Sequence, residues 1–276
     1  MSAAFRLTLG YTTLYAGPLE TITAAAEAGF NSVGIRITGR RPSDPDAGVI
    51  GNSVALRQLS GRLRSTGMRL SNVSAYHFHP GLELSDYLPV IEASAELGAP
   101  FIVASCYDAD EQRYVETLER FAEAAADFAI SLALEFIPYS EAKTIEDARR
   151  LIRRAGRPNL GILVDSLHLD RSEGVPADVA AIEPNLISYA QLCDASSRRP
   201  LTSEALRNEA ITGRLYPGEG SLPLFEFLDA LPAGAELECE LPNAALSSLS
   251  VVEKARRAHQ AMTHFFDAYA SARNTK

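Results

Sequence analysis

The feature that most constrains the fold is an alternation, along the whole chain, of short apolar runs with amphipathic helical patterns. The apolar runs are rich in residues that favour β-strands, and apolar residues recur at helical spacing in the segments between them. Such an alternation predicts βα units that build a parallel sheet. Eight strands are predicted, at residues 6–10, 32–37, 69–74, 101–105, 131–136, 160–165, 186–192 and 236–241.

Helices are expected between and after these strands, at residues 18–28, 53–66, 85–97, 111–129, 144–155, 177–182, 222–231 and 250–270. Several of them end in a glycine, as a left-handed C-cap would: Gly29, Gly67, Gly98 and Gly156. Eight βα units in 276 residues predict an α/β fold with a single (β/α)8 TIM barrel domain over residues 1–276. A doubly wound open sheet is the alternative. Its nucleotide-binding form is disfavoured because no GxGxxG motif follows the first predicted strand.

Composition narrows the classes of partner. The formal net charge is -9 and the sequence pI is about 5.1, so nucleic acid is a poor partner for the chain. The N-terminus lacks the pattern of a signal peptide, and no apolar run is long enough to span a membrane. The three cysteines are far apart in the sequence, as is typical of free thiols in a reducing compartment. We therefore expect a cytoplasmic protein with a small-molecule partner, bound neither to nucleic acid nor to a membrane.

Four consecutive predicted strands end in a side chain that carries oxygen: Glu135, Asp165, Gln191 and Glu240. The carboxyl ends of barrel strands meet at one rim, where the active sites of such barrels lie. A carboxylate at the end of an apolar strand is costly unless it is paired, exposed or bound to a metal. These hard oxygen donors favour one Mn²⁺ or Mg²⁺ ion, with Co²⁺ as a further option. The alternative is four unrelated rim residues that form salt bridges.

Further candidates surround this cluster. His168, in the loop after the sixth strand, suits a catalytic acid or base or a hydrogen bond to substrate, although it could simply cap that loop. Arg214, in the RLYPGEG loop, and more weakly Arg36 suit anion or hydroxyl recognition, with a plain surface loop as the alternative for Arg214. Asp194 suits a substrate contact or a turn, and His77, of the AYHFHP segment, suits the substrate pocket.

With these motifs the chain resembles the xylose isomerase-like barrel superfamily of sugar phosphate isomerases and epimerases. The matching stretches are EAGFNSVGIR, LGAPFIVAS, LALEFIP, GILVDSLHLDRS, YAQLCDA, RLYPGEGSLPL and ECELPN. The resemblance implies that Glu135, Asp165, the position of Gln191, and Glu240 bind one divalent cation. The superfamily usually has histidine where this chain has Gln191, and a glutamine there resembles the 3-dehydroshikimate dehydratase branch. Glu238 is the alternative ligand on the eighth strand.

The leading hypothesis is an isomerase or epimerase of a small polyhydroxy carbonyl compound. The metal would stabilise an enediolate. The resemblance to the epimerases of the superfamily implies that Glu135 and Glu240 would exchange protons with the two faces of the substrate, while His168 would hold a hydroxyl group. The alternative is a lyase that dehydrates a cyclic keto acid, with His168 as the base. The departure at Gln191 favours this second hypothesis.

Two other readings are weaker. A nuclease related to endonuclease IV would need many histidine ligands, and the chain has only five histidines. A non-catalytic binding protein would be indicated if Glu240→Gln left turnover unchanged. Members of the superfamily often form dimers or tetramers, so a homo-oligomer is an open expectation, and the sequence does not identify the substrate.

Overall fold

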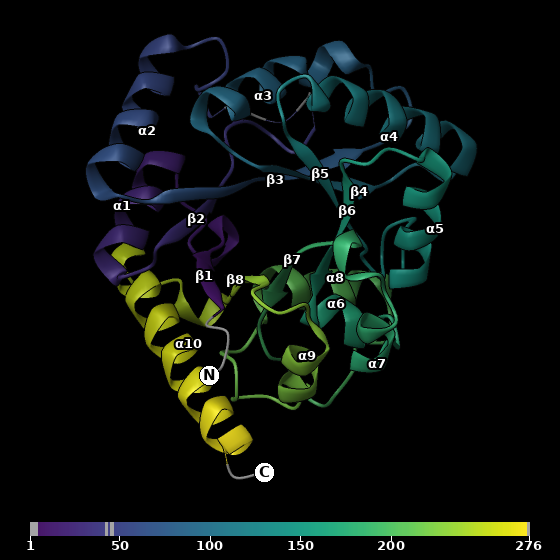
Figure 1. The fold of residues 1–276 in the computed structure, drawn as a ribbon. Coiled ribbons are helices and arrows are strands. Elements are labelled where there is room, and N and C mark those ends of the chain that lie inside the picture. The colour runs from purple at the N-terminus through teal and green to yellow at the C-terminus, as the bar shows by residue number, and fades with distance from the viewer. Residues whose placement is uncertain (1–4, 42–43, 45–46, 275–276) are drawn as a thin grey trace.

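The computed structural model describes residues 5–41, 44 and 47–274, and within them eight parallel strands form a closed barrel (Figure 1). Each strand pairs with its neighbours in chain order, and β8 pairs with β1 to close the barrel. This confirms the predicted (β/α)8 barrel. The strands are β1 (Arg6–Leu9), β2 (Ser32–Ile35), β3 (Arg69–Phe78), β4 (Phe101–Cys106), β5 (Ser131–Glu135), β6 (Leu160–Asp165), β7 (Ile187–Leu192) and β8 (Glu236–Cys239).

Helices surround the barrel (Figure 1). They are α1 (Pro18–Ala28), α2 (Ser53–Thr66), α3 (Leu84–Leu97), α4 (Glu111–Ala126), α5 (Ile145–Ala155), α6 (Ser166–Arg171), α7 (Pro176–Ala180), α8 (Ser203–Thr212), α9 (Leu224–Ala230) and α10 (Val251–Asn274), with short 3-10 turns at η1 (Tyr11–Thr13), η2 (Pro184–Leu186) and η3 (Ala244–Leu246). The predicted C-caps Gly29, Gly67, Gly98 and Gly156 are confirmed, because each has a positive φ directly after its helix.

Two helices were not predicted, and both lie near the rim of the barrel. Helix α6 has six residues, which is too short for a helical repeat of apolar residues to emerge. Helix α8 buries only Ala210, so its sequence looks like a polar loop. The residues expected in loops at 166–171 and 203–212 are therefore helical.

The inward face of the barrel changes from apolar to polar toward the carboxyl ends of the strands. Val103, Ala133, Leu163 and Tyr189 form a buried apolar cluster. Two residues further along the same four strands, and therefore on the same face, are Ser105, Glu135, Asp165 and Gln191. The strand periodicity thus places the polar residues directly above a packed apolar layer.

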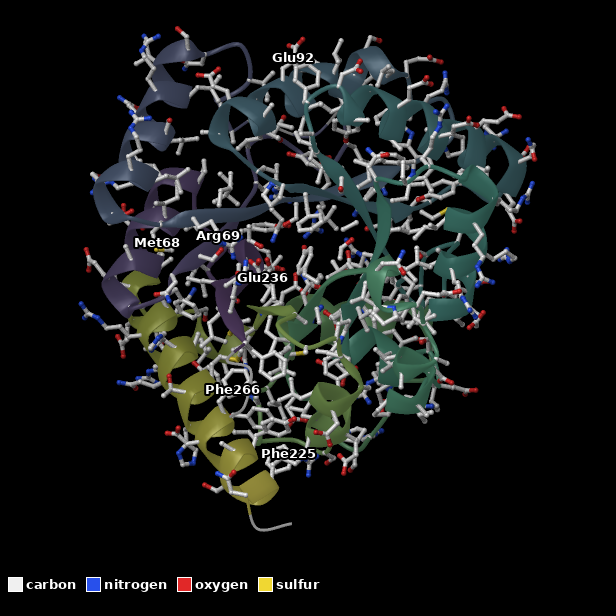
Figure 2. The ribbon with its side chains drawn as sticks, in the orientation of Figure 1. Met68, Arg69, Glu92, Phe225, Glu236 and Phe266 are labelled. Atoms are coloured by element: carbon white, nitrogen blue, oxygen red, sulfur yellow. The ribbon has the colours of Figure 1, made fainter. Side chains whose placement is uncertain are left out.

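Outside the barrel, the long helix α10 packs against α1 (Figure 1). Helix α10 also meets α9 through aromatic side chains, since the ring centroids of Phe225 and Phe265 lie 5.3 Å apart. Phe266, also in α10, packs on Phe5 just before β1, with 5.7 Å between the ring centroids; Figure 2 labels Phe225 and Phe266. Among the described residues, no helix combines the length and the apolar character needed to cross a bilayer.

Candidate active site

The polar residues at the carboxyl ends of β5 to β8 cluster at the floor of a pocket, where Glu135 and Glu240 line it and Asp165 and Gln191 are buried beyond its lining. Glu135 ends β5, Asp165 ends β6, Gln191 lies in β7, and Glu240 follows β8 directly; all four side chains are buried. The pocket opens beyond the carboxyl ends of the strands. Its lining includes Thr12, His77, Ser105, Tyr107, Glu135, Tyr139, His168, Arg214 and Glu240.

Asp165 is held from two sides. Its Oδ1 accepts hydrogen bonds from the backbone N–H groups of Leu167 and His168, at 2.7 and 3.0 Å, so the carboxylate also caps the N-terminus of α6. Its Oδ2 accepts a hydrogen bond from Arg214 Nη1 at 2.5 Å. Burial opposes ionisation, but Arg214 and the hydrogen bonds outweigh it and lower the pKa of Asp165 to about 2. Asp165 is therefore a carboxylate at neutral pH.

Arg214 lies deep in the floor, with only 3% of its surface exposed. Its guanidinium bridges two carboxylates, with Nη1 at 2.5 Å from Asp165 Oδ2 and Nη2 at 2.8 Å from Glu240 Oε2. Its Nε donates to the carbonyl of Ala210 in α8 at 2.9 Å. Glu240 is also held by Thr12, whose hydroxyl donates to Oε1 at 2.8 Å. Arg214 thus neutralises part of the negative charge of the floor.

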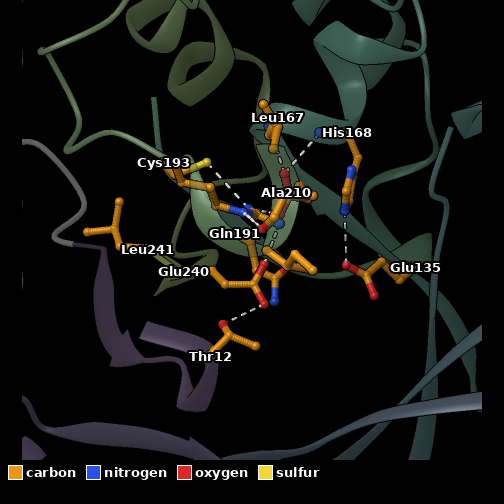
Figure 3. A network of polar contacts seen from close by, with 12 residues as sticks. Thr12, Glu135, Leu167, His168, Gln191, Cys193, Ala210, Glu240 and Leu241 are labelled. Atoms are coloured by element: carbon orange, nitrogen blue, oxygen red, sulfur yellow. Dashed lines mark hydrogen bonds and ion pairs between the residues drawn. The ribbon is translucent and has the colours of Figure 1, made fainter. Parts of the chain in front are cut away.

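His168 and Glu135 lie beside each other in the pocket. His168 lies in α6, not in the loop that we expected, and its Nε2 is 3.7 Å from Glu135 Oε1 (Figure 3). Burial lowers the pKa of His168 to about 4, although Asp165 acts in the opposite direction, so the ring is neutral at pH 7. Burial, together with the charges of Glu240 and Asp165, raises the pKa of Glu135 well above its usual value.

The eighth strand presents three glutamates on the inward face, one above another. Glu236, nearest the amino ends of the strands, forms an ion pair with Arg69 at 2.7 Å (Figure 2). Glu238 lies in the middle and accepts hydrogen bonds from the side-chain amides of Gln191 and Asn72. Burial and the charge of Glu240 raise the pKa of Glu238 to about 8, while the two amides act in the opposite direction. Glu240, at the carboxyl end, is the glutamate of the three that lines the pocket.

The remaining predicted residues have different surroundings. His77, at the end of β3, lines the pocket with its ring 4.3 Å from that of Tyr107. Arg36 does not line it, because its guanidinium lies over the ring of Tyr11 and donates to the Tyr11 hydroxyl. Asp194 lies outside the pocket lining as well; it accepts hydrogen bonds from the backbone N–H groups of Gly218, Gly220 and Leu222, and so shapes the loop that follows Arg214.

Two arginines that the sequence reading missed also line the pocket, Arg40 and Arg207. Arg40 Nη2 donates to the Tyr11 hydroxyl at 3.0 Å, and its buried Nε has no hydrogen-bond partner. Neither guanidinium forms an ion pair with a carboxylate in the part of the chain that the structure describes. Arg40 lies in the loop after β2, and Arg207 lies on α8. Had α8 been predicted from the sequence, Arg207 would have been a candidate for the pocket lining.

The side chains present fit a divalent metal ion. Glu135, Asp165 and His168 each offer a ligand atom, and these three atoms lie within 4.8 Å of one another. Gln191 Oε1 is buried and has no hydrogen-bond partner, as expected of an oxygen that serves as a ligand. Carboxylate oxygens, an amide oxygen and an imidazole nitrogen are all common ligands of divalent cations. Coordination by Gln191 and Glu240 stays a prediction.

Known proteins share this fold and parts of this sequence. A 137-residue segment is 29% identical to a 3-dehydroshikimate dehydratase of Pseudomonas aeruginosa, over 49% of this chain and only 19% of that protein. A 158-residue segment is 23% identical to an inosose isomerase of Halalkalibacterium halodurans, over 54% of each chain. The crystal structure of an IolI protein with a bound zinc atom superposes with a TM-score of 0.80 at 17% identity, over 96% of this chain and 99% of that one. Residues 22–265, from α1 into α10, match the sequence model of the xylose isomerase-like TIM barrel family, and the chain belongs to this family.

Proposed function

We propose that the chain is a divalent-metal-dependent lyase that removes water from a small cyclic hydroxy keto acid, 3-dehydroshikimate or a close analogue. The observation that carries the proposal is the charge pattern of the pocket. Its floor holds carboxylates suited to a cation, and its lining holds Arg40 and Arg207, neither of which has a carboxylate partner among the described residues. An arginine that has no acidic partner suits the carboxylate of a substrate, whereas a neutral sugar offers no such charge.

The proposed metal ligands are Glu135, Asp165, Gln191 and Glu240, with Mn²⁺ or Mg²⁺ as the ion. When bound, the ion would act as a Lewis acid that stabilises negative charge developing on the substrate carbonyl oxygen. Arg214 supports this arrangement by holding Asp165 and Glu240 through two separate guanidinium nitrogens. The resemblance of a 137-residue segment of the chain to a 3-dehydroshikimate dehydratase of Pseudomonas aeruginosa supports dehydration as the reaction.

His168 is the proposed base. Its ring is neutral at pH 7 because burial lowers its pKa, and it lies beside Glu135 in the pocket. It would take the proton from the carbon next to the carbonyl, so that the C–H bond breaks and its electron pair forms a C=C bond as the β C–O bond breaks. The same proton then leaves with the departing hydroxyl group as water. The net change is the loss of one water molecule without oxidation or reduction.

A direct assay tests the proposal. The Mn²⁺-loaded protein, incubated with 3-dehydroshikimate, should produce a conjugated product with a new ultraviolet absorption band, and His168→Asn should abolish that product. Arg207→Gln should raise KM more than it lowers kcat, because Arg207 would bind the substrate carboxylate and take no part in proton transfer. No absorbance change with the acid, under conditions in which the protein binds Mn²⁺, would overturn the proposal.

A second candidate is an isomerase or epimerase of a neutral polyhydroxy carbonyl compound. One observation favours it: Glu135 and Glu240 both line the pocket, as two proton carriers on opposite faces of a substrate would. The resemblance to an inosose isomerase also supports a neutral polyhydroxy carbonyl compound as the substrate. Incubation of ketoses and inososes in D₂O distinguishes the two candidates, because deuterium incorporation without loss of water would identify an isomerase.

A further inference from the structure

We infer that Glu238 is a positioning residue that sets the orientation of the Gln191 amide and so directs its oxygen to the metal. The inference rests on the proposed function only in requiring a metal ion at this site. It concerns how one ligand is held, and it does not depend on which reaction the enzyme catalyses.

The need for such a residue follows from the chemistry of an amide. The two ends of the Gln191 side chain are nearly equal in size, but only the oxygen can bind a cation, because the NH₂ group is a donor without a free electron pair. A rotation of the terminal group by 180° would therefore present the wrong end. A glutamine ligand requires a neighbour that binds its NH₂ group and rejects its oxygen.

Glu238 meets this requirement. Gln191 Nε2 donates to Glu238 Oε1 at 2.8 Å, and Gln191 Oε1 is left buried without a hydrogen-bond partner. Residues 191 and 238 are paired in the β7–β8 ladder, so the backbone fixes their separation. Both Glu238 oxygens accept a hydrogen bond from a side-chain amide, Oε1 from Gln191 Nε2 and Oε2 from Asn72 Nδ2, so Glu238 binds the NH₂ end of the Gln191 amide and leaves its oxygen without a partner.

The carboxylate of Glu238 is itself held firmly. Asn72 donates to its other oxygen, Oε2. The backbones of β1 and β2 also approach it closely: a Cβ atom added at Gly10 would lie 2.8 Å from Glu238 Oε1, and one added at Gly34 would lie 2.7 Å from Oε2. Both oxygens thus have a donor, and the close approach of Gly10 and Gly34 limits movement of the group toward β1 and β2. The chain of contacts from Asn72 through Glu238 to Gln191 forms one connected unit.

A double-mutant cycle on metal affinity tests the inference. Protein stripped with EDTA is titrated with Mn²⁺, and the dissociation constant is measured by calorimetry and by the electron paramagnetic resonance of free Mn²⁺. Glu238→Gln should raise that constant about 10–100-fold, the range typical for partners that orient metal ligands. The matched control is Glu236→Gln, which removes one negative charge from the same face of the same strand without touching Gln191, and it should change the constant less than about threefold.

The cycle separates orientation from charge. In a Gln191→Ala background, Glu238→Gln should have almost no further effect, since the ligand that it positions is gone. An undiminished effect in that background, or an unchanged affinity in Glu238→Gln itself, would overturn the inference. Circular dichroism and thermal unfolding verify that each variant folds. If Glu238→Gln does not fold, Asn72→Ala replaces it, and an unchanged Mn²⁺ affinity in that variant would equally refute the inference.

Discussion

The ion pairs of Arg214 make a quantitative prediction about stability. Arg214→Met removes a buried guanidinium that bridges Asp165 and Glu240 at 2.5 and 2.8 Å, and it keeps much of the side-chain volume. Removing one partner of a buried ion pair typically costs about 3–5 kcal/mol, because the other charge remains buried without compensation. Two carboxylates lose a partner here, although Asp165 keeps two backbone donors and Glu240 keeps Thr12. We therefore expect a loss of about 3–5 kcal/mol at pH 7 in EDTA-treated protein.

Urea unfolding followed by circular dichroism measures this loss, with the m-value checked for constancy. Arg207→Met is the matched control: Arg207 lines the same pocket but is exposed and forms no ion pair within the described residues, so its loss should change the free energy of unfolding by less than about 0.5 kcal/mol. Mn²⁺ at about 100 times its dissociation constant should return about 2.7 kcal/mol to the Arg214 variant, if the carboxylates still bind the ion.

The pH dependence of the Arg214 variant provides an independent check. Without the guanidinium, the pKa values of the buried carboxylates rise above those of the unfolded chain, so the folded state binds more protons as the pH falls. The destabilisation should therefore shrink on acidification, by up to about 1.4 kcal/mol per pH unit for each carboxylate that titrates. If Arg214→Met were as stable as the parent protein at pH 7, or if its deficit grew on acidification, the assignment of Arg214 as the buried counter-ion would be refuted.

Three further predictions follow from the pocket and its surroundings. Burial, with the charge of Arg40, lowers the pKa of His77 to about 3, so between pH 3 and 6.5 the unfolded chain binds one proton more than the folded chain and the free energy of unfolding rises with pH. In urea unfolding, His77→Gln should reduce this rise by about 1.4 kcal/mol per pH unit. Asp194→Ala should cost about 1–3 kcal/mol and speed amide exchange at Gly220 and its neighbours, detected by mass spectrometry, because their donors lose an acceptor. Gly34→Ala should cost about 1–3 kcal/mol in urea unfolding and weaken Mn²⁺ binding, because the added Cβ collides with Glu238.

The barrel could be predicted because its signal is repeated and local. Strand β6 and helices α1 and α2 have the predicted bounds, and the remaining strands differ from prediction by a few residues at their ends. The largest difference is β3, which continues to Phe78 because its last residues pair with Ala104, Ser105 and Cys106 in β4. Pairing between distant segments is a tertiary effect that strand propensity does not contain.

The site was less predictable, since contacts between loops decide it. The four strand-end oxygens at Glu135, Asp165, Gln191 and Glu240 are visible as a pattern, but nothing in the sequence indicates that Arg214 lies between two of them. That position depends on α8, whose Ala210 carbonyl accepts the Arg214 Nε hydrogen bond. A short helix with one buried residue has almost no amphipathic pattern, so neither α8 nor its contact with Arg214 could be predicted from the sequence.

The three glutamates of the eighth strand show how strand periodicity assigns different roles to one residue type. Glu236, Glu238 and Glu240 share the inward face, yet each meets a different partner, because successive inward positions lie at different depths in the barrel. Glu236, at the amino end, pairs with Arg69, and Glu238, in the middle, accepts hydrogen bonds from two side-chain amides. Glu240, at the carboxyl end, pairs with Arg214 and lines the pocket. Depth alone therefore separates a structural ion pair from a positioning contact and a candidate ligand. A register shift of one residue would turn all three outward, so the closed hydrogen-bond ladder of the barrel maintains the chemistry of its rim.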